Sequence, residues 1–301
     1  MFLSRESSAD ELSAGRPAAP SRRIARLVLR CLVPLVLLAA AWQWLLRHAD
    51  VDALWRTMGS VPAAAWFAAG VALLSGHALR ALRLQQEWRH VRHAGFFACL
   101  RLVLLHNAAV LLLPLRSGEA GYLYLVQREF GVGWRESAPR LAWWRVQDAA
   151  VLLALSILLL VPWPVAARLL LVAAFVLLAV SLVPRPSSWL GLAASAGNWT
   201  FKVAANGGLM MLLGGFGVGA AARAGLGGEI AGVLPVQGPA GLGTYEAGAW
   251  IASHLPEAQQ GSFVAAALAV HAFSLAVALG AAAIALWRDR VVAARAPLQA
   301  A

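Results

Sequence analysis

The segment Leu111–Glu129, LLLPLRSGEAGYLYLVQRE, breaks an apolar run with a proline that is followed by charged and small residues. A second segment, Gly232–Glu246, GVLPVQGPAGLGTYE, repeats this layout of an apolar run, Leu-Pro, a polar glycine-rich tip and an acidic residue. Charged groups are costly inside a membrane and usually mark functional sites there. We interpret the two segments as broken helices that face each other and are held by ordinary spanning helices.

The composition is that of a membrane protein. Of the 301 residues, 60% are hydrophobic and 13% are charged, and the mean hydropathy is +0.69. Several apolar windows reach the ~20 residues that a helix needs to cross a bilayer, and no alternating pattern of about ten residues indicates a barrel. The sequence therefore predicts an all-α fold, a polytopic integral membrane helical bundle.

The net charge of +11 does not indicate a nucleic-acid-binding protein. The arginines cluster beside apolar segments, where the positive-inside bias and anionic lipid headgroups account for them. Cys31 and Cys99 both lie in apolar segments, so neither a disulfide framework nor a thiolate metal site is expected.

Six full spans are expected around the two broken segments. They cover residues 27–46, 63–79, 141–163, 165–183, 189–214 and 262–287. Residues 1–23 are polar and lack apolar periodicity, so we expect a disordered cytoplasmic tail. Residues 24–290 then form a single transmembrane domain, and residues 291–301 form a second cytoplasmic tail.

Arginine clusters predict the orientation. The first cluster follows the second span and marks the cytoplasmic face; it comprises Arg80, Arg83, Arg89 and Arg92. If the first broken segment crossed the bilayer fully, the arginines from Arg116 to Arg140 would lie outside, against this bias. We therefore prefer a re-entrant segment to a full crossing, and a bacterial inner-membrane protein with both termini in the cytoplasm.

The two tips supply the candidate substrate-binding site. Their glycines allow positive φ and leave backbone amides free to hold an anionic group. Arg116 could pair with a phosphate or with Glu119, and Arg145 with Asp148 at a spacing of three on one helical face. The candidate residues are Asn107, Pro114, Arg116, Gly118, Glu119, Arg145, Asp148, Pro235, Gly241, Gly243 and Glu246.

Simpler interpretations stay open for this site. The first segment could be a packing kink and the second a surface loop, and Arg145 could extend to the membrane interface. Asn198, Lys202 and Asn206 follow a spacing of four and predict a polar stripe on one helix. His271 lies in the last span and is either a hydrogen-bonding group that faces the bundle, which we favour, or a proton-sensitive group. We see no catalytic triad, metal cluster or phosphate-binding loop, and expect no catalytic residue, metal or cofactor.

The chain resembles the lysylphosphatidylglycerol synthase transmembrane-region family, also called flippase-like integral membrane proteins. The resemblance rests on Asn107, PLRSGE at 114–119, Arg145 with Asp148, and Leu-Pro at 234–235 with GLGTYE at 241–246. It covers roughly residues 27–287 and implies the lipid-translocating part without the soluble synthase domain. Trp144 and His271 depart from the glutamate and the arginine usual in that family, which weakens any implication of the same substrate.

The residues and the resemblance together predict an inner-membrane lipid transporter or flippase rather than an enzyme. Its partners would be membrane lipids with an anionic or zwitterionic headgroup, with a second copy or a lipid-synthesis enzyme as further candidates. The alternatives are a membrane-embedded enzyme acting on lipid-linked substrates and a non-catalytic scaffold for such an enzyme. The sequence does not identify the lipid, the direction of transport or the energy source.

Overall fold

A computed structural model describes residues 51–113, 117–182, 186–234 and 238–295 of the chain. Within these ranges the regular elements are helices and no strand occurs, as the composition predicts. The expected span at 27–46 and the tail at 1–23 lie outside the described residues.

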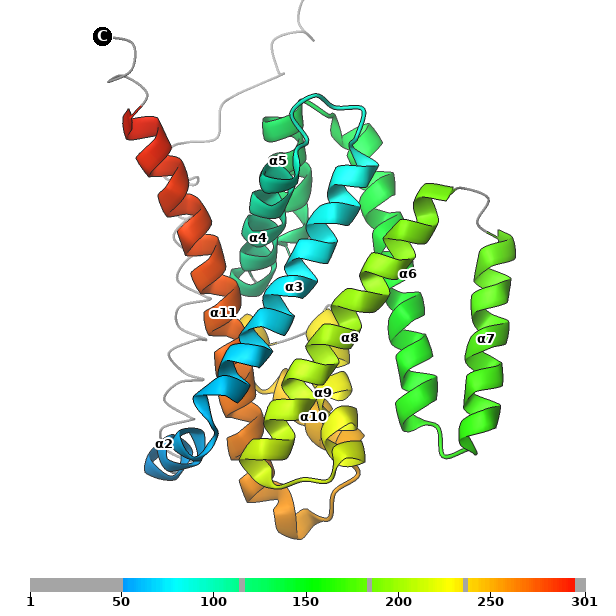
Figure 1. Cartoon of the computed structure of the whole chain (residues 1–301), viewed down its shortest axis with the longest axis vertical. Coiled ribbons are helices and arrows are strands. Elements are labelled where there is room, and N and C mark those ends of the chain that lie inside the picture. The colour runs from blue at the N-terminus through cyan, green and yellow to red at the C-terminus, as the bar shows by residue number, and fades with distance from the viewer. Residues whose placement is uncertain (1–50, 114–116, 183–185, 235–237, 296–301) are drawn as a thin grey trace, which may run out of the picture.

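Long helices frame the fold (Figure 1). They are α3 (Ala63–Glu87), α6 (Trp134–Leu160), α7 (Val165–Leu182), α8 (Pro186–Gly214) and α11 (Gln260–Arg295), with α2 (Val51–Ser60) before α3. Within the described residues, three segments are long and apolar enough to cross a membrane, namely α3, α6 and Glu257–Arg288, which includes most of α11. The protein therefore has the helices of a membrane protein.

The first broken segment forms a helical hairpin of α4 (Phe96–Leu112) and α5 (Glu119–Phe130), hereafter the first hairpin. An ion pair of 2.8 Å joins Arg101 early in α4 to Glu129 late in α5, so the two helices run antiparallel. Gly118 lies against the last turns of α4, and a Cβ there would be 2.3 Å from the Ala109 carbonyl carbon. Glycine is required at this tip because a side chain would collide with backbone.

The second broken segment forms the second hairpin, α9 (Val218–Val233) and α10 (Thr244–Ser253), with a short helix η2 (Pro239–Gly241) at its tip. Gly227 and Gly248 bring the two helices into backbone contact, because a Cβ on Gly227 would lie 2.3 Å from the Gly248 carbonyl oxygen. Gly241 and Gly243 both have a φ of 81°, which an L side chain rarely adopts. The chain thus turns sharply between the helices, as the glycine-rich sequence predicts.

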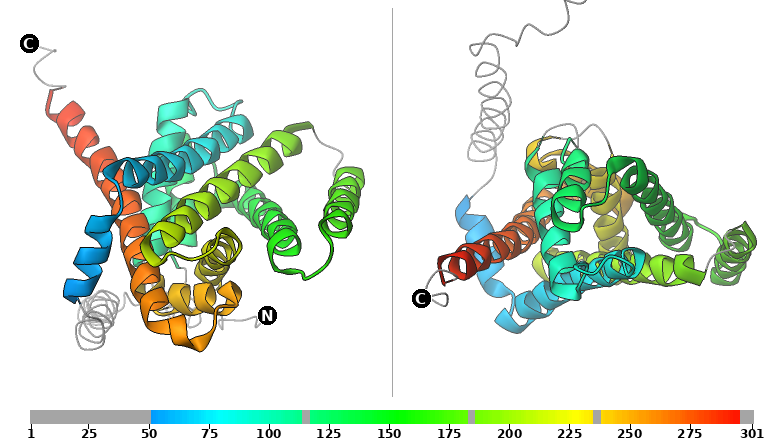
Figure 2. Two further views of the ribbon diagram at one scale, coloured as in Figure 1. Left: turned by 60° about the horizontal axis from the view of Figure 1, so that its bottom comes forward. Right: turned by 90° about the horizontal axis from the view of Figure 1, so that it is seen from above.

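The two hairpins enter the bundle from opposite ends, and the tip of the second contacts α4 of the first (Figure 1). α3 and α8 pack together along their length, and α11 contacts α3, α4 and α8. α7 stands at the edge of the bundle and contacts α6 (Figures 1 and 2). This arrangement brings η2 at the second tip against α4 of the first hairpin.

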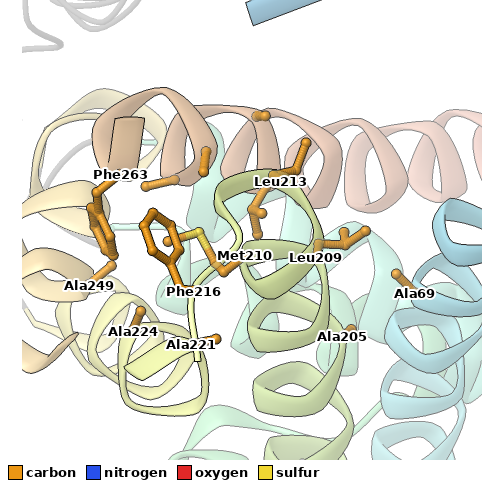
Figure 3. Packing of buried hydrophobic residues seen from close by; sticks show 14 of the residues in the cluster. Ala69, Ala205, Leu209, Met210, Leu213, Phe216, Ala221, Ala224, Ala249 and Phe263 are labelled. Atoms are coloured by element: carbon orange, nitrogen blue, oxygen red, sulfur yellow. The ribbon is translucent and has the colours of Figure 1, made fainter. Parts of the chain in front are cut away.

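Small residues line the main core, which joins α3, α8, the second hairpin and α11 (Figure 3). Its labelled members include Ala69, Ala205, Ala221, Ala224 and Ala249, all buried. Small side chains let helix backbones approach closely, which is how helices associate where no water drives them together. The core holds the second hairpin firmly against α8.

The second span is longer than its sequence suggests. α3 continues beyond Leu79 to Glu87, and the side chain of Arg83 is 4% exposed. Arg80 and Arg83 are therefore part of a packed helix and do not form an exposed basic cluster with Arg89. The helix continues because the sequence from 80 to 87, RALRLQQE, contains good helix formers and no glycine or proline.

Candidate functional site

A cavity of about 130 Å³, hereafter the central cavity, lies between α4 of the first hairpin, the second hairpin and the long helices. Residues of α3, α4, α6, α8, α11 and the second hairpin line it, and most of the polar ones are ionisable or amide side chains. These polar residues are His77, Arg80, His106, Asn107, Arg145, Asp148, Asn198, Lys202, Glu229 and His271. The site is therefore a polar interior space in an apolar bundle.

Arg145 connects α6 to the tip of the first hairpin. One terminal nitrogen of its guanidinium lies 2.6 and 2.7 Å from the two oxygens of Glu119, the first residue of α5. Its other terminal nitrogen lies 3.3 Å from Asp148. The buried His106 of α4 lies 3.6 Å from Glu119 and completes the cluster. Arg145 thus pairs across helices, and the simple intrahelical pair is only part of its environment.

Asp148 of α6 is contacted by side chains from two other helices, α3 and α8. Arg83 of α3 donates to it at 3.1 Å, and the Ser195 hydroxyl of α8 donates at 2.6 Å. The second terminal nitrogen of Arg83 donates to Gln147. Asp148 therefore holds α3, α6 and α8 together through charged and polar contacts that are all buried.

Lys202 and Glu229 form a second buried cluster on the other side of the cavity. The Lys202 ammonium lies 2.7 Å from Glu229, and the Asn206 amide donates to the same carboxylate at 2.8 Å. Ser274 of α11 donates to Asn206 at 2.9 Å. Asn198, Lys202 and Asn206 share one face of α8, as their spacing predicts, and this face turns toward the cavity and the second hairpin.

The pair Lys202–Glu229 predicts a measurable coupling. Lys202→Met and Glu229→Gln each remove one charge of the pair, whereas Lys202→Met combined with Glu229→Gln removes both charges. A double-mutant cycle by thermal unfolding in detergent should give a coupling of about 0.5–3 kcal/mol, with the double variant more stable than the sum of the single changes. Additive effects would show that the two side chains do not interact in the folded protein.

Glu246 holds the tip of the second hairpin. Its carboxylate accepts from the Gly243 backbone N–H at 2.7 Å and lies 2.8 Å from Nδ1 of His271 in α11. The His271 ring stacks on Tyr245 with centroids 4.4 Å apart. Glu246 follows the second tip as Glu119 follows the first, and each glutamate pairs with a side chain of a long helix.

The comparisons with known proteins identify no relative. The chain matches no protein-family model, no curated protein and no solved structure. The resemblance to the flippase-like family therefore stays a prediction, and the site is interpreted from its own geometry.

The structure places the predicted site residues in three groups. Asn107, Arg145, Asp148 and Gly241 line the cavity, and Glu119 binds two of its lining residues. Gly118, Gly243 and Glu246 shape or anchor the tips. Pro114, Arg116 and Pro235 lie outside the described residues, so a pairing of Arg116 with Glu119 stays a prediction.

Sequence reasoning missed several site residues. The arginine pattern predicts that Arg80 and Arg83 lie at the cytoplasmic face, and the sequence predicts no role for His77, His106 or Glu229. The spacing of Leu73, His77 and Arg80 carried a signal, because all three fall on one helical face and line the cavity. Glu229 comes directly before the apolar residues 230–234, and its sequence neighbours give no sign of its partner on α8.

Proposed function

We propose that the chain is a multi-pass protein of the bacterial inner membrane that moves a lipid headgroup through the central cavity. The observation that carries the proposal is the cavity itself, where α4 of the first hairpin and the tip of the second meet charged side chains inside a bundle that contains membrane-length helices. Buried charge in such a bundle is expensive, and it marks substrate pathways in transporters. The acyl chains would remain in the lipid while the headgroup passes between the hairpins.

Alternating access gives this geometry a mechanism. Hairpins that enter from opposite faces and meet at a midplane site are typical of transporters built from inverted repeats. Glu119 and Glu246 each lie in the first turn of the helix after a tip, where they pair with Arg145 of α6 and His271 of α11. Release of one of these pairs would free its tip to move, which would open the cavity to one face at a time.

Basic residues favour one orientation. An ion pair of 3.2 Å between Arg140 and Glu87 joins the start of α6 to the end of α3, and Arg288 of α11 lies over the Phe97 ring at the start of α4. Arginines are frequent at this end of the bundle, and the positive-inside bias makes it cytoplasmic. The first hairpin is then re-entrant from the cytoplasm.

Cysteine labelling tests this orientation. Arg135→Cys at the basic end and Glu257→Cys at the opposite end both replace exposed side chains. In intact cells or spheroplasts, an impermeant thiol reagent should label the cysteine at 257 and should reach the one at 135 only after the membrane is opened. External labelling at 135 would contradict the re-entrant first hairpin.

Lipid exchange by the purified protein in liposomes tests the function. We expect headgroup-labelled lipid to become accessible to an impermeant quencher, and Glu119→Gln to slow this exchange at least tenfold because the Arg145 contact is weakened. Glu257→Gln is the control, since it changes the same group at an exposed position. Absence of exchange with every lipid and ion gradient tried would favour the enzyme or scaffold alternatives.

A further inference from the structure

The two hairpins are held to the long helices by chemically different contacts. Glu119 of the first hairpin pairs with Arg145, and a guanidinium group stays charged in proteins. Glu246 of the second hairpin pairs instead with His271, whose Nδ1 lies 2.8 Å from the carboxylate. An imidazole ordinarily gains or loses its charge between about pH 5 and 8. A proton can therefore change the contact at the second hairpin, whereas the charges of the Glu119–Arg145 pair are fixed near neutral pH.

Other carboxylates of the central cavity pair with side chains that remain cationic near neutral pH. Asp148 pairs with two arginines, and Glu229 pairs with Lys202 at 2.7 Å. Glu246 makes no ion pair with an arginine or lysine in the part of the chain that the structure describes. Its partner His271 is buried and lines the cavity, so the cavity gives a proton access to the pair.

Two neighbours of the His271 ring attract its positively charged form. One is the Glu246 carboxylate, and the other is the Tyr245 ring, which stacks on the imidazole with an interplanar angle of 26°. The face of an aromatic ring attracts a cation. Both neighbours belong to α10 and lie beside the imidazole only while the tip is in place. The closed tip therefore binds a proton more tightly than an open tip, and by linkage the proton stabilises the closed tip.

Glu246 connects this contact to the backbone of the second tip. Its other carboxylate oxygen accepts from the Gly243 backbone N–H at 2.7 Å. Ala240 in the same tip has a φ of 53°, a conformation that a non-glycine residue keeps only where its surroundings hold it. On the other side of the contact, Ser274 of α11 donates to Asn206 of α8 at 2.9 Å. Because α11 is held by α8, loss of the contact would release the tip rather than α11.

Two other histidines line the cavity but are less suited to this role. Nε2 of His106 lies 3.6 Å from Glu119, but Arg145 is 3.4 Å from the same nitrogen and opposes a second positive charge there. His77 makes no ion pair within the described ranges. The remaining charged side chains that line the cavity are Arg80 of α3, Asp148 of α6, Lys202 of α8 and Glu229 of α9. α2 and η3 (Glu257–Gln259) also contact α11, but they contribute none of the described lining residues.

We infer that the Glu246–His271 pair is a proton-binding site that holds the second tip closed, and that H⁺ is the ion coupled to the proposed transport. His271 binds one proton on its ring as the tip closes and releases it as the tip opens. Only an N–H bond forms and breaks, so no further reactant is required. The coupling rests on the proposed function and supplies its energy source, whereas the proton-binding site stands on its own geometry.

Hydrogen exchange at the second tip tests the proton-binding site without lipid transport. The full chain in a non-ionic detergent is compared at about pH 5.5 and about pH 8, with rates corrected for the intrinsic pH dependence of amide exchange. We expect the amides of residues 241–248 to be about tenfold more protected at the lower pH, because a charged contact is stronger than a neutral hydrogen bond. His271→Gln should remove this difference. The same difference in His271→Gln, or none in the wild type, would overturn the inference.

Matched variants assign the proton to this pair. His93→Gln changes an exposed histidine outside the cavity and should keep the pH dependence of the wild type. Glu246→Gln retains an acceptor for the Gly243 N–H but removes the charge, so the tip should be weakly protected at both pH values. Melting temperatures in detergent verify that each variant folds. Loss of the pH dependence in His106→Gln together with its retention in His271→Gln would assign the proton to the first hairpin and overturn the inference.

A pH gradient across liposomes tests the coupling and separates it from the proposed transport. We expect the gradient to drive net movement of labelled lipid toward one leaflet, with a proton flux that an enclosed pH dye reports. His271→Gln should lose this response, and His93→Gln should keep it. Lipid exchange that ignores the gradient would support transport and contradict the coupling. Proton-dependent protection of the tip without lipid exchange under any condition would support the proton-binding site and contradict the transport proposal.

Discussion

Asp148→Asn is expected to lower the free energy of unfolding by about 3–5 kcal/mol, the usual cost of removing one partner of a buried ion pair. Arg83 is 4% exposed and would keep its charge without an ion-pair partner at 148, beside the Gln147 amide and the Trp144 ring. Ser195 would lose a charged acceptor 2.6 Å away. Three helices meet at this carboxylate, so the loss should appear as a lower midpoint in thermal or denaturant unfolding of the detergent-solubilised protein.

The matched change at an exposed pair is Glu136→Gln. Glu136 pairs with Arg140 at 3.0 Å and a spacing of four, and half of its side chain is exposed. Exposed pairs of this kind contribute only about 0.3–0.5 kcal/mol. Similar small losses at 136 and 148 would show that Asp148 does not connect the helices as described.

Gly227→Ala is expected to have the second large effect, a loss of about 1–3 kcal/mol or more from overpacking. The new Cβ would lie 2.3 Å from the Gly248 carbonyl oxygen and 2.4 Å from the Ala252 side chain. Backbone cannot move aside as a side chain can, so α9 and α10 would have to separate. The second hairpin would then unfold at a lower temperature, which thermal unfolding and protease sensitivity between the two helices can measure.

Gly208→Ala is expected to increase stability, in contrast to Gly227→Ala. Gly208 lies inside α8, and a Cβ there would have no atom within 4 Å. Alanine in place of a helical glycine without a steric conflict stabilises by about 0.5–1 kcal/mol. A stability loss at 227 and a gain at 208 would confirm close packing of the second hairpin, whereas gains at both positions would contradict it.

The sequence predicted the two hairpins well, for a physical reason. Proline combined with closely spaced glycines favours a break in an apolar helix, so the tips near Gly118 and Gly241 could be located from residue types. Neither residue type alone is sufficient, because α6 continues through Pro139 and α8 through the adjacent Gly207 and Gly208. The polar stripe of Asn198, Lys202 and Asn206 was equally visible, because helical periodicity fixes which residues share a face. The first of the six expected spans lies outside the described residues, and the inverted repeat stays part of the proposal.

The partners of the charged residues could not be predicted. The positive-inside bias uses arginines near the ends of apolar runs, and it therefore predicts Arg80 and Arg83 at the membrane surface. They lie in a packed helix instead, because α3 extends about two turns further than its hydropathy indicates. The pairs Arg83–Asp148 and Lys202–Glu229 join residues far apart in sequence. Only the packing of α3, α6, α8 and the second hairpin brings them together.

A reducible cross-link across the cavity most directly tests the central claim that lipid passes between the hairpin tips. Val110 of α4 and Ala240 at the second tip both line the cavity, and α4 contacts this tip. Both are changed to cysteine in a background without Cys31 and Cys99, and a reducible cross-linker joins them, as mass spectrometry can verify. Lipid exchange in liposomes should stop after cross-linking, return on reduction, and continue in each single-cysteine control. Undiminished exchange by the fully cross-linked protein would contradict the proposed route.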